Sequence, residues 1–274
     1  MFDTLFCPFM LKAFLISATA AVPFGLIGTF VVVRRIGYLA GAIAHCALGG
    51  VGAGLYLQFI LSGTVFAALF PPSAVSAAVT ILSALLIGAI HFQAKEREDT
   101  IIGAVWVITM AAGFILLDIT PGSGNISAYL FGDVLLITNT DMILVAGLST
   151  VILAAVIIFF QRFEAVCFDP EFAKVRGIST AFYFLLLLVL TAMTVVTLVQ
   201  VVGIVLVIAM LTLPAATACR LAKRLLPICG IAVLIGFLSS WIGLVMSVWL
   251  YLPAGSSIVL VAATFYLLSL LKRN

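Results

Sequence analysis

The stretch KAFLISATAAVPFGLIGTFVVVRR, from Lys12 to Arg35, decides the fold class. Its interior carries no charged side chain, and two arginines follow the run at once. The hydrocarbon core of a bilayer is roughly 30 Å thick, and about 20 helical residues cross it. The stretch therefore predicts a membrane-spanning helix that ends at a membrane surface with Arg34 and Arg35.

The composition extends this prediction to the whole chain. Of 274 residues, 65% are hydrophobic and 8% are charged, and the mean hydropathy is +1.38. A soluble domain carries about a quarter of its residues as Asp, Glu, Lys or Arg. We therefore expect one all-α polytopic membrane domain over residues 1–274. The net charge of +3 is small and scattered, which argues against nucleic acid as a partner.

Charged gaps between the apolar runs orient the predicted spans, because cytoplasmic gaps are enriched in Lys and Arg. Threading the chain through alternating basic and non-basic gaps gives eight or nine helices, with the N-terminus outside and the C-terminus inside. Two places leave the number open. The segment from Ile126 to Thr138 is short enough to be a re-entrant half-helix. The run from Phe182 to Ala218 has to fold back through a very short turn.

Polar groups inside a span are costly, so each is a functional candidate. Gly41, His45 and Gly49 follow one another at intervals of four residues and therefore share a helix face. One interpretation is close helix packing, with the imidazole bonded to a neighbouring helix. The other is a transient metal ligand on a transport pathway, because neutral imidazole binds ions such as zinc and small neighbours leave room for an ion.

Asp133 is a second polar candidate, in the apolar segment near the predicted outer face. Its carboxylate is suited to capping a helix, to accepting a hydrogen bond from Tyr129, or to standing at a gate of the pathway.

The segment from Glu164 to Ser179 differs in character from the rest of the chain. Asp169 followed by Pro170 is a typical helix start, and Gly177 is placed to end that helix. The pattern predicts a short amphipathic helix outside the bilayer. Two interpretations stay open: the helix lies on lipid, or it docks a cytoplasmic partner.

With these residues in view, the chain resembles the permease subunits of bacterial ABC transporters that import zinc, manganese or ferrous iron. Six stretches resemble that family's signatures and follow its order: GLIGTFVVVRRIGYLAGAIAHCALGGVGAGLYL, KEREDTIIGAVW, ISAYLFGDVLLIT, FDPEFAKVRGI, VVGIVLVIAMLTLPAATACRL and LPAGSSIVLVAATFYLLS.

The resemblance implies a homodimer in the bacterial cytoplasmic membrane, bound to cytoplasmic ATPase subunits and supplied by an extracytoplasmic metal-binding protein. ATP would bind the partner subunit, the cargo would be a divalent metal ion, and this chain would hold no permanent cofactor and no catalytic residue. The segment 164–179 would be the coupling segment that docks on the ATPase, through Phe168, Asp169, Pro170, Glu171, Phe172, Lys174 and Gly177.

Two positions depart from the family pattern. Many members carry an Asp one turn before the histidine, where this chain has Gly41, and an Asp where it has Tyr251. Loss of hard oxygen ligands beside a retained imidazole favours zinc over manganese. Two other functions would each require features of their own. A self-powered secondary carrier would place coupled ionisable groups in repeated halves, and an intramembrane metalloenzyme would need several facing ligands.

Overall fold

The computed structural model describes residues 8–62, 70–93, 98–121 and 138–271. The described residues form helices and no strands. Nine of these helices are long and apolar enough to cross a membrane, which confirms the all-α polytopic fold. They are α2 (Pro8–Val33), α3 (Gly37–Ile60), α4 (Pro72–Gln93), α5 (Glu98–Ile119), α7 (Asn139–Phe168), α9 (Thr180–Val202), α10 (Ile204–Leu221), α11 (Leu225–Leu250) and α12 (Ala254–Leu271).

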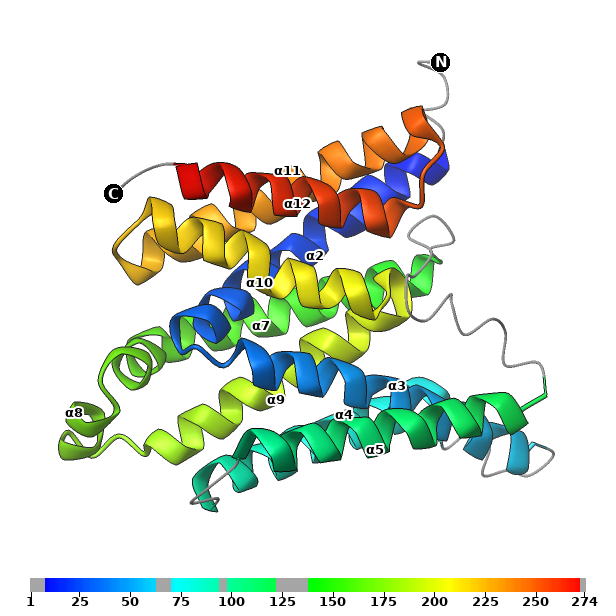
Figure 1. Cartoon of the computed structure of the whole chain (residues 1–274), viewed down its shortest axis with the longest axis horizontal. Helices are drawn as coiled ribbons and strands as arrows, with labels where there is room; N and C mark the ends of the chain where they lie inside the picture. The colour runs from blue at the N-terminus through cyan, green and yellow to red at the C-terminus, as the bar shows by residue number, and fades with distance from the viewer. Residues whose placement is uncertain (1–7, 63–69, 94–97, 122–137, 272–274) are drawn as a thin grey trace.

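The spans pack as one bundle around α2 and α9, the two that are buried most completely. Helix α2 contacts α7, α10 and α11, whereas α9 lies between α7 on one side and α3 and α4 on the other. Helices α3, α4 and α5 form the opposite edge of the bundle from α11 and α12 (Figure 1). The buried core is almost wholly aliphatic and aromatic, and one continuous cluster of apolar side chains joins most of the spans.

Charge separates the two ends of the bundle. The α2–α3 and α10–α11 connections lie at the left of Figure 1 and carry arginines that include Arg34, Arg35 and Arg224. The α9–α10 and α11–α12 connections lie at the right. Asp141, in the first turn of α7, lies at that right-hand end. The enrichment of Lys and Arg on the cytoplasmic side therefore makes the left end cytoplasmic.

The predicted fold-back within residues 182–218 is confirmed, and one residue makes it. Gly203 alone separates α9 from α10, and its backbone has φ 80° and ψ 162°. This region of backbone conformation is open essentially to glycine alone. Its N–H donates to the Val199 carbonyl and closes α9, while its own carbonyl accepts from Val207 in α10.

The short helix α8 (Pro170–Val175) is the one described helix that is too short to span the membrane. It follows α7 directly and lies beyond the cytoplasmic ends of the spans (Figure 1). The segment from Ile126 to Thr138, which we considered as a re-entrant half-helix, lies outside the described residues except for Thr138.

Candidate functional site

His45 lies on α3 in a stretch of small residues that brings other helices close. Its side chain is half-buried, and alanines and glycines predominate around it on the helix, with Ile43, Cys46 and Leu48 among them. A β-carbon built on Gly41, one turn before His45, has no atom within 4 Å. The imidazole therefore has open space on the Gly41 side.

The opposite end of the same face packs tightly. A β-carbon built on Gly49 would stand 2.5 Å from the carbonyl oxygen of Thr109 in α5, and one built on Gly52 would clash with the carbonyl of Gly113. Close approach of this kind requires glycine, because backbone atoms cannot turn aside as a side chain can. At Gly49 the structure thus shows the helix packing that we gave as the alternative to a pathway role.

Helices α3 and α5 meet along one parallel row of residue pairs, which we call the α3–α5 seam. Both helices run from the cytoplasmic end outward (Figure 1), so successive residues of one meet successive residues of the other in nearly the same register. In order from the cytoplasmic end, the pairs are Tyr38 with Asp99, His45 with Trp106, Gly49 with Thr109, and Gly52 with Gly113.

Sequence spacing explains the register. Tyr38, His45 and Gly52 follow one another at seven-residue intervals, and so do their partners Asp99, Trp106 and Gly113. Residues seven apart lie on the same face after two helical turns, so two helices that share this repeat stay in contact along it. The hydroxyl of Tyr38 donates to the Asp99 carbonyl at 2.6 Å and fixes the cytoplasmic end of the seam.

The His45 ring is stacked on Trp106. The two ring centroids are 4.7 Å apart, and the ring planes are inclined by 30°. The Nδ1 atom of His45 is buried and makes no hydrogen bond. The side chain as a whole is half-buried, so part of it other than Nδ1 is exposed.

No preformed cluster of metal ligands accompanies His45. Within the described ranges, no three His, Cys, Asp or Glu side chains come together in a way that could hold a metal ion. Cys46 is completely buried and lies beside the hydroxyls of Ser83 and Thr109, on a different face of α3 from its neighbour His45.

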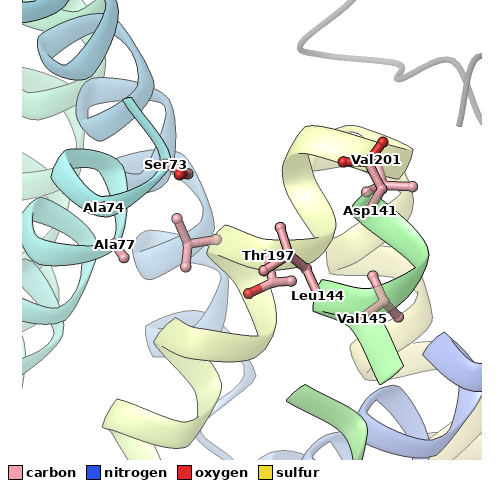
Figure 2. A pocket seen from close by; sticks show the side chains of 9 residues that line it. Ser73, Ala74, Ala77, Asp141, Leu144, Val145, Thr197 and Val201 are labelled. Carbon is pink, nitrogen blue, oxygen red and sulfur yellow. The ribbon is translucent and has the colours of Figure 1, made fainter. Parts of the chain in front are cut away.

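A separate cavity of about 240 Å³ lies at the outer end of the bundle, between α4, α7 and α9 (Figure 2). Its polar lining comes from Ser73, Asp141 and Thr197. The Asp141 carboxylate is already engaged, since it accepts hydrogen bonds from the backbone N–H of Thr138 at 2.9 Å and from the Thr138 hydroxyl at 2.6 Å. This capping box ties Asp141 to the start of α7.

The segment around α8 folds as its sequence indicates. The Asp169 carboxylate accepts from the Phe172 N–H at 2.9 Å, Pro170 is the first helical residue, and Gly177 follows with φ 77°. Glu171 and Lys174 form an ion pair at 2.9 Å.

Apolar side chains on this segment face outward. Phe168, Phe172 and Val175 are 59%, 50% and 87% exposed, respectively. The Arg176 guanidinium lies 4.7 Å from the centre of the Phe172 ring. An exposed apolar patch beyond the spans is typical of a protein contact.

The first turns of α9, which follow α8 in the chain, contact three other spans. Arg162 of α7 donates to the Tyr183 hydroxyl at 2.8 Å, and the His91 ring of α4 stacks on Phe184 at 4.6 Å between centroids. The Arg34 guanidinium at the end of α2 lies 5.8 Å from the same Phe184 ring.

One predicted site residue is not described by the structure, and three residues of α5 join the site without having been predicted. Asp133 lies outside the described residues, and its role as cap or gate stays a prediction. Trp106, Thr109 and Gly113 were not singled out from the sequence, although Trp106 and Gly113 carry the seven-residue spacing that pairs them with α3. This spacing is visible in the sequence, but the sequence does not show with which helix these residues pair.

Comparison with known proteins decides the family. The model of the ABC 3 transport family matches residues 7–273. This chain belongs to the ABC 3 transport family. The resemblance drawn from the sequence is confirmed, and the chain is a permease of an ABC metal-uptake system. As such it is a multi-pass protein of the bacterial inner membrane.

Individual relatives of this ABC permease match over nearly their whole length. A "probable metal transport system membrane protein" of Chlamydia trachomatis is 37% identical over 274 residues, which are 99% of this chain and 91% of that protein. The manganese transport system membrane protein MntC of Listeria monocytogenes is 31% identical over 265 residues, 96% of this chain and 90% of that protein. The solved structure of PsaBC from Streptococcus pneumoniae in complex with Fab has a TM-score of 0.85 at 32% identity, covering 98% of this chain and 93% of that chain.

Proposed function

We propose that this permease carries zinc across the cytoplasmic membrane in an importer driven by ATP hydrolysis on a separate subunit. The family membership supports transport of a metal, and the donor chemistry near His45 supports the choice of ion. Two copies of the chain would form the membrane part, and an extracytoplasmic metal-binding protein would deliver the ion.

The single observation that carries the pathway role is the setting of His45. A half-buried imidazole stands inside a span, open on the Gly41 side and with Nδ1 lacking a partner. Polar side chains inside a membrane span are costly, and those that occur there usually serve a function. We assign to His45 the role of a transient ligand through Nε2, with Gly41 giving the ion room. Gly49 would act on the same pathway indirectly, by holding α5 against α3.

The choice of zinc follows from ligand type. Imidazole suits zinc, whereas manganese prefers carboxylate and other oxygen ligands. Gly41 stands where a carboxylate one turn before His45 would supply such an oxygen. The name of the relative MntC points instead to manganese, so the ion has to be tested directly.

The coupling role of residues 164–179 rests on a rigid, outward-facing helix. The cap by Asp169, the ion pair between Glu171 and Lys174, and the turn at Gly177 fix the shape of α8 without help from a partner. Phe168, Phe172 and Val175 present apolar surface to the cytoplasm. We infer that this surface inserts into a cleft of the ATPase subunit.

Uptake by reconstituted liposomes tests the proposal. The permease, the ATPase and the metal-binding protein are assembled, and uptake of radiolabelled zinc is measured with and without ATP, in competition with manganese and ferrous iron. We expect ATP-dependent zinc uptake that His45→Ala abolishes. His91→Phe is the matched control, because it removes the other histidine but keeps a ring on Phe184.

Three results would contradict separate parts of the proposal. Normal uptake by His45→Ala would remove His45 from the pathway. Preference for manganese would overturn the choice of ion. Metal accumulation by the permease alone, driven by an ion gradient, would support the secondary carrier instead.

A further inference from the structure

On α3 the His45 ring has open space on one side. Its neighbours in the chain are Ala44 and Cys46, Leu48 lies three residues on, and a β-carbon built on Gly41, one turn before, meets no atom within 4 Å. The second side-chain torsion of histidine has a broad distribution without sharply staggered minima. A ring that no neighbouring side chain contacts would therefore sample many orientations. Nothing on α3 itself aims the Nε2 atom.

Trp106 of α5 packs against one face of the His45 ring. Its indole covers one face of the imidazole at 4.7 Å between centroids. Stacked aromatic pairs prefer a limited range of offsets and inclinations. The contact therefore restricts the plane in which the His45 nitrogens lie.

The seam fixes Trp106 in turn, and it does so without using His45. On the outer side, Gly52 and Gly113 bring the two backbones together, and on the cytoplasmic side Tyr38 is bonded to the Asp99 carbonyl. Trp106 lies seven residues from each of these α5 positions. Its place opposite His45 is thus set by contacts two helical turns away in both directions.

We propose that Trp106 is a positioning residue for metal transfer: its indole fixes the His45 ring so that Nε2 points toward the passing ion. This inference rests on the proposed role of His45 as a ligand. Groups that contact a metal-binding histidine and fix its orientation commonly contribute about 10- to 100-fold to metal affinity or activity. Trp106 would do so by stacking in place of a hydrogen bond.

Substitution of Trp106 in the complete importer tests this role. Trp106→Leu keeps apolar volume but removes the ring, and Trp106→Phe keeps a ring. We expect Trp106→Leu to raise the zinc concentration for half-maximal uptake by about 10- to 100-fold, while the maximal rate at saturating zinc falls less. Trp106→Phe should restore most of the affinity. Trp249→Leu, a change at an exposed tryptophan on α11, is the control and should leave uptake unchanged.

A spectroscopic measurement gives a second readout that does not depend on transport. In the Trp241→Phe, Trp249→Phe background, Trp106 is the remaining tryptophan of the chain. Added Co²⁺, used as a quenching probe for a divalent transition metal, should quench Trp106 fluorescence. His45→Ala should abolish this quenching.

The outcomes separate the inference from the proposed function. If His45→Ala loses uptake but Trp106→Leu folds and transports zinc with unchanged affinity, Trp106 has no positioning role and His45 keeps its own. If His45→Ala transports normally, the proposed ligand role fails first. If Trp106→Leu does not fold, Trp106→Met takes its place as the variant without a ring, and a zinc affinity equal to that of the parent overturns the inference. Quenching that persists in His45→Ala counts against the ligand role of His45.

Discussion

Gly113 of α5 lies so close to Gly49 of α3 that a β-carbon built on Gly113 would stand 2.5 Å from the Gly49 Cα. The obstructing atoms are backbone atoms, so the helices themselves would have to separate to admit a methyl group. Both helices contribute glycine at the point where they cross.

Gly113→Ala should therefore destabilise the protein. Overpacking of this kind costs about 1–3 kcal/mol, and we expect a lower midpoint of thermal unfolding in detergent, followed by tryptophan fluorescence. Gly147→Ala in α7 is the control, because a β-carbon there meets no atom within 4 Å. Equal midpoints for the two variants would mean that the crossing is looser than described.

Gly203→Ala should also destabilise the bundle, for a different reason. With φ 80° and ψ 162°, the single residue between α9 and α10 uses a conformation that side chains disfavour, at a cost of about 1–3 kcal/mol. Gly230→Ala, in the regular helix α11 with open space around it, should be neutral. The midpoint of thermal unfolding measures both, and an unshifted midpoint for Gly203→Ala would contradict the account of the fold-back.

Asp169→Ala should weaken attachment of the ATPase without disturbing the spans. Loss of an N-cap costs about 0.5–2 kcal/mol of helix stability, and α8 has only six residues. Asp169→Asn keeps a capping oxygen and should bind almost as the parent does. Co-purification of the ATPase with each variant is the measurement, and equal recovery with both would show that the cap does not matter for docking.

Labelling should report the orientation of the bundle. Tyr251 is 96% exposed at the outer end of α11, and Val175 is 87% exposed on α8. In a background with Cys7→Ser, Tyr251→Cys should react with a membrane-impermeant maleimide added to intact cells. In cells that produce the permease without the ATPase, Val175→Cys should react only after the cells are opened. The reverse pattern would invert the assignment of the cytoplasmic end.

Much of the fold could be predicted from the sequence, because the bilayer imposes strong local rules. Apolar run length located the spans, and the run closed by Arg34 and Arg35 corresponds to α2. The cap at Asp169 and the fold-back at Gly203 also follow from local chemistry. Helix ends were less predictable: α2 begins at Pro8, before the apolar run that we quoted from Lys12.

The candidate site could be predicted only in part. His45 stood out because imidazole is rare in a span and its neighbours are small. Its contact with Trp106 could not be inferred, because the register between two helices depends on contacts far apart in the sequence. Glycine and tyrosine at the ends of the α3–α5 seam set that register, and the residue type alone does not predict which residue each of them contacts.

The position of α5 at the edge of the bundle has a consequence for the surrounding lipid. It is the least buried of the candidate spans among the described residues, and α3 provides most of its packing. With 22 residues at 1.5 Å each, α5 is about 33 Å long. A bilayer thinner than this length would tilt the helix or deform around it. Because α3 provides most of the packing of α5, we expect acyl-chain length to affect the contact between these two helices and, through it, the rate of uptake.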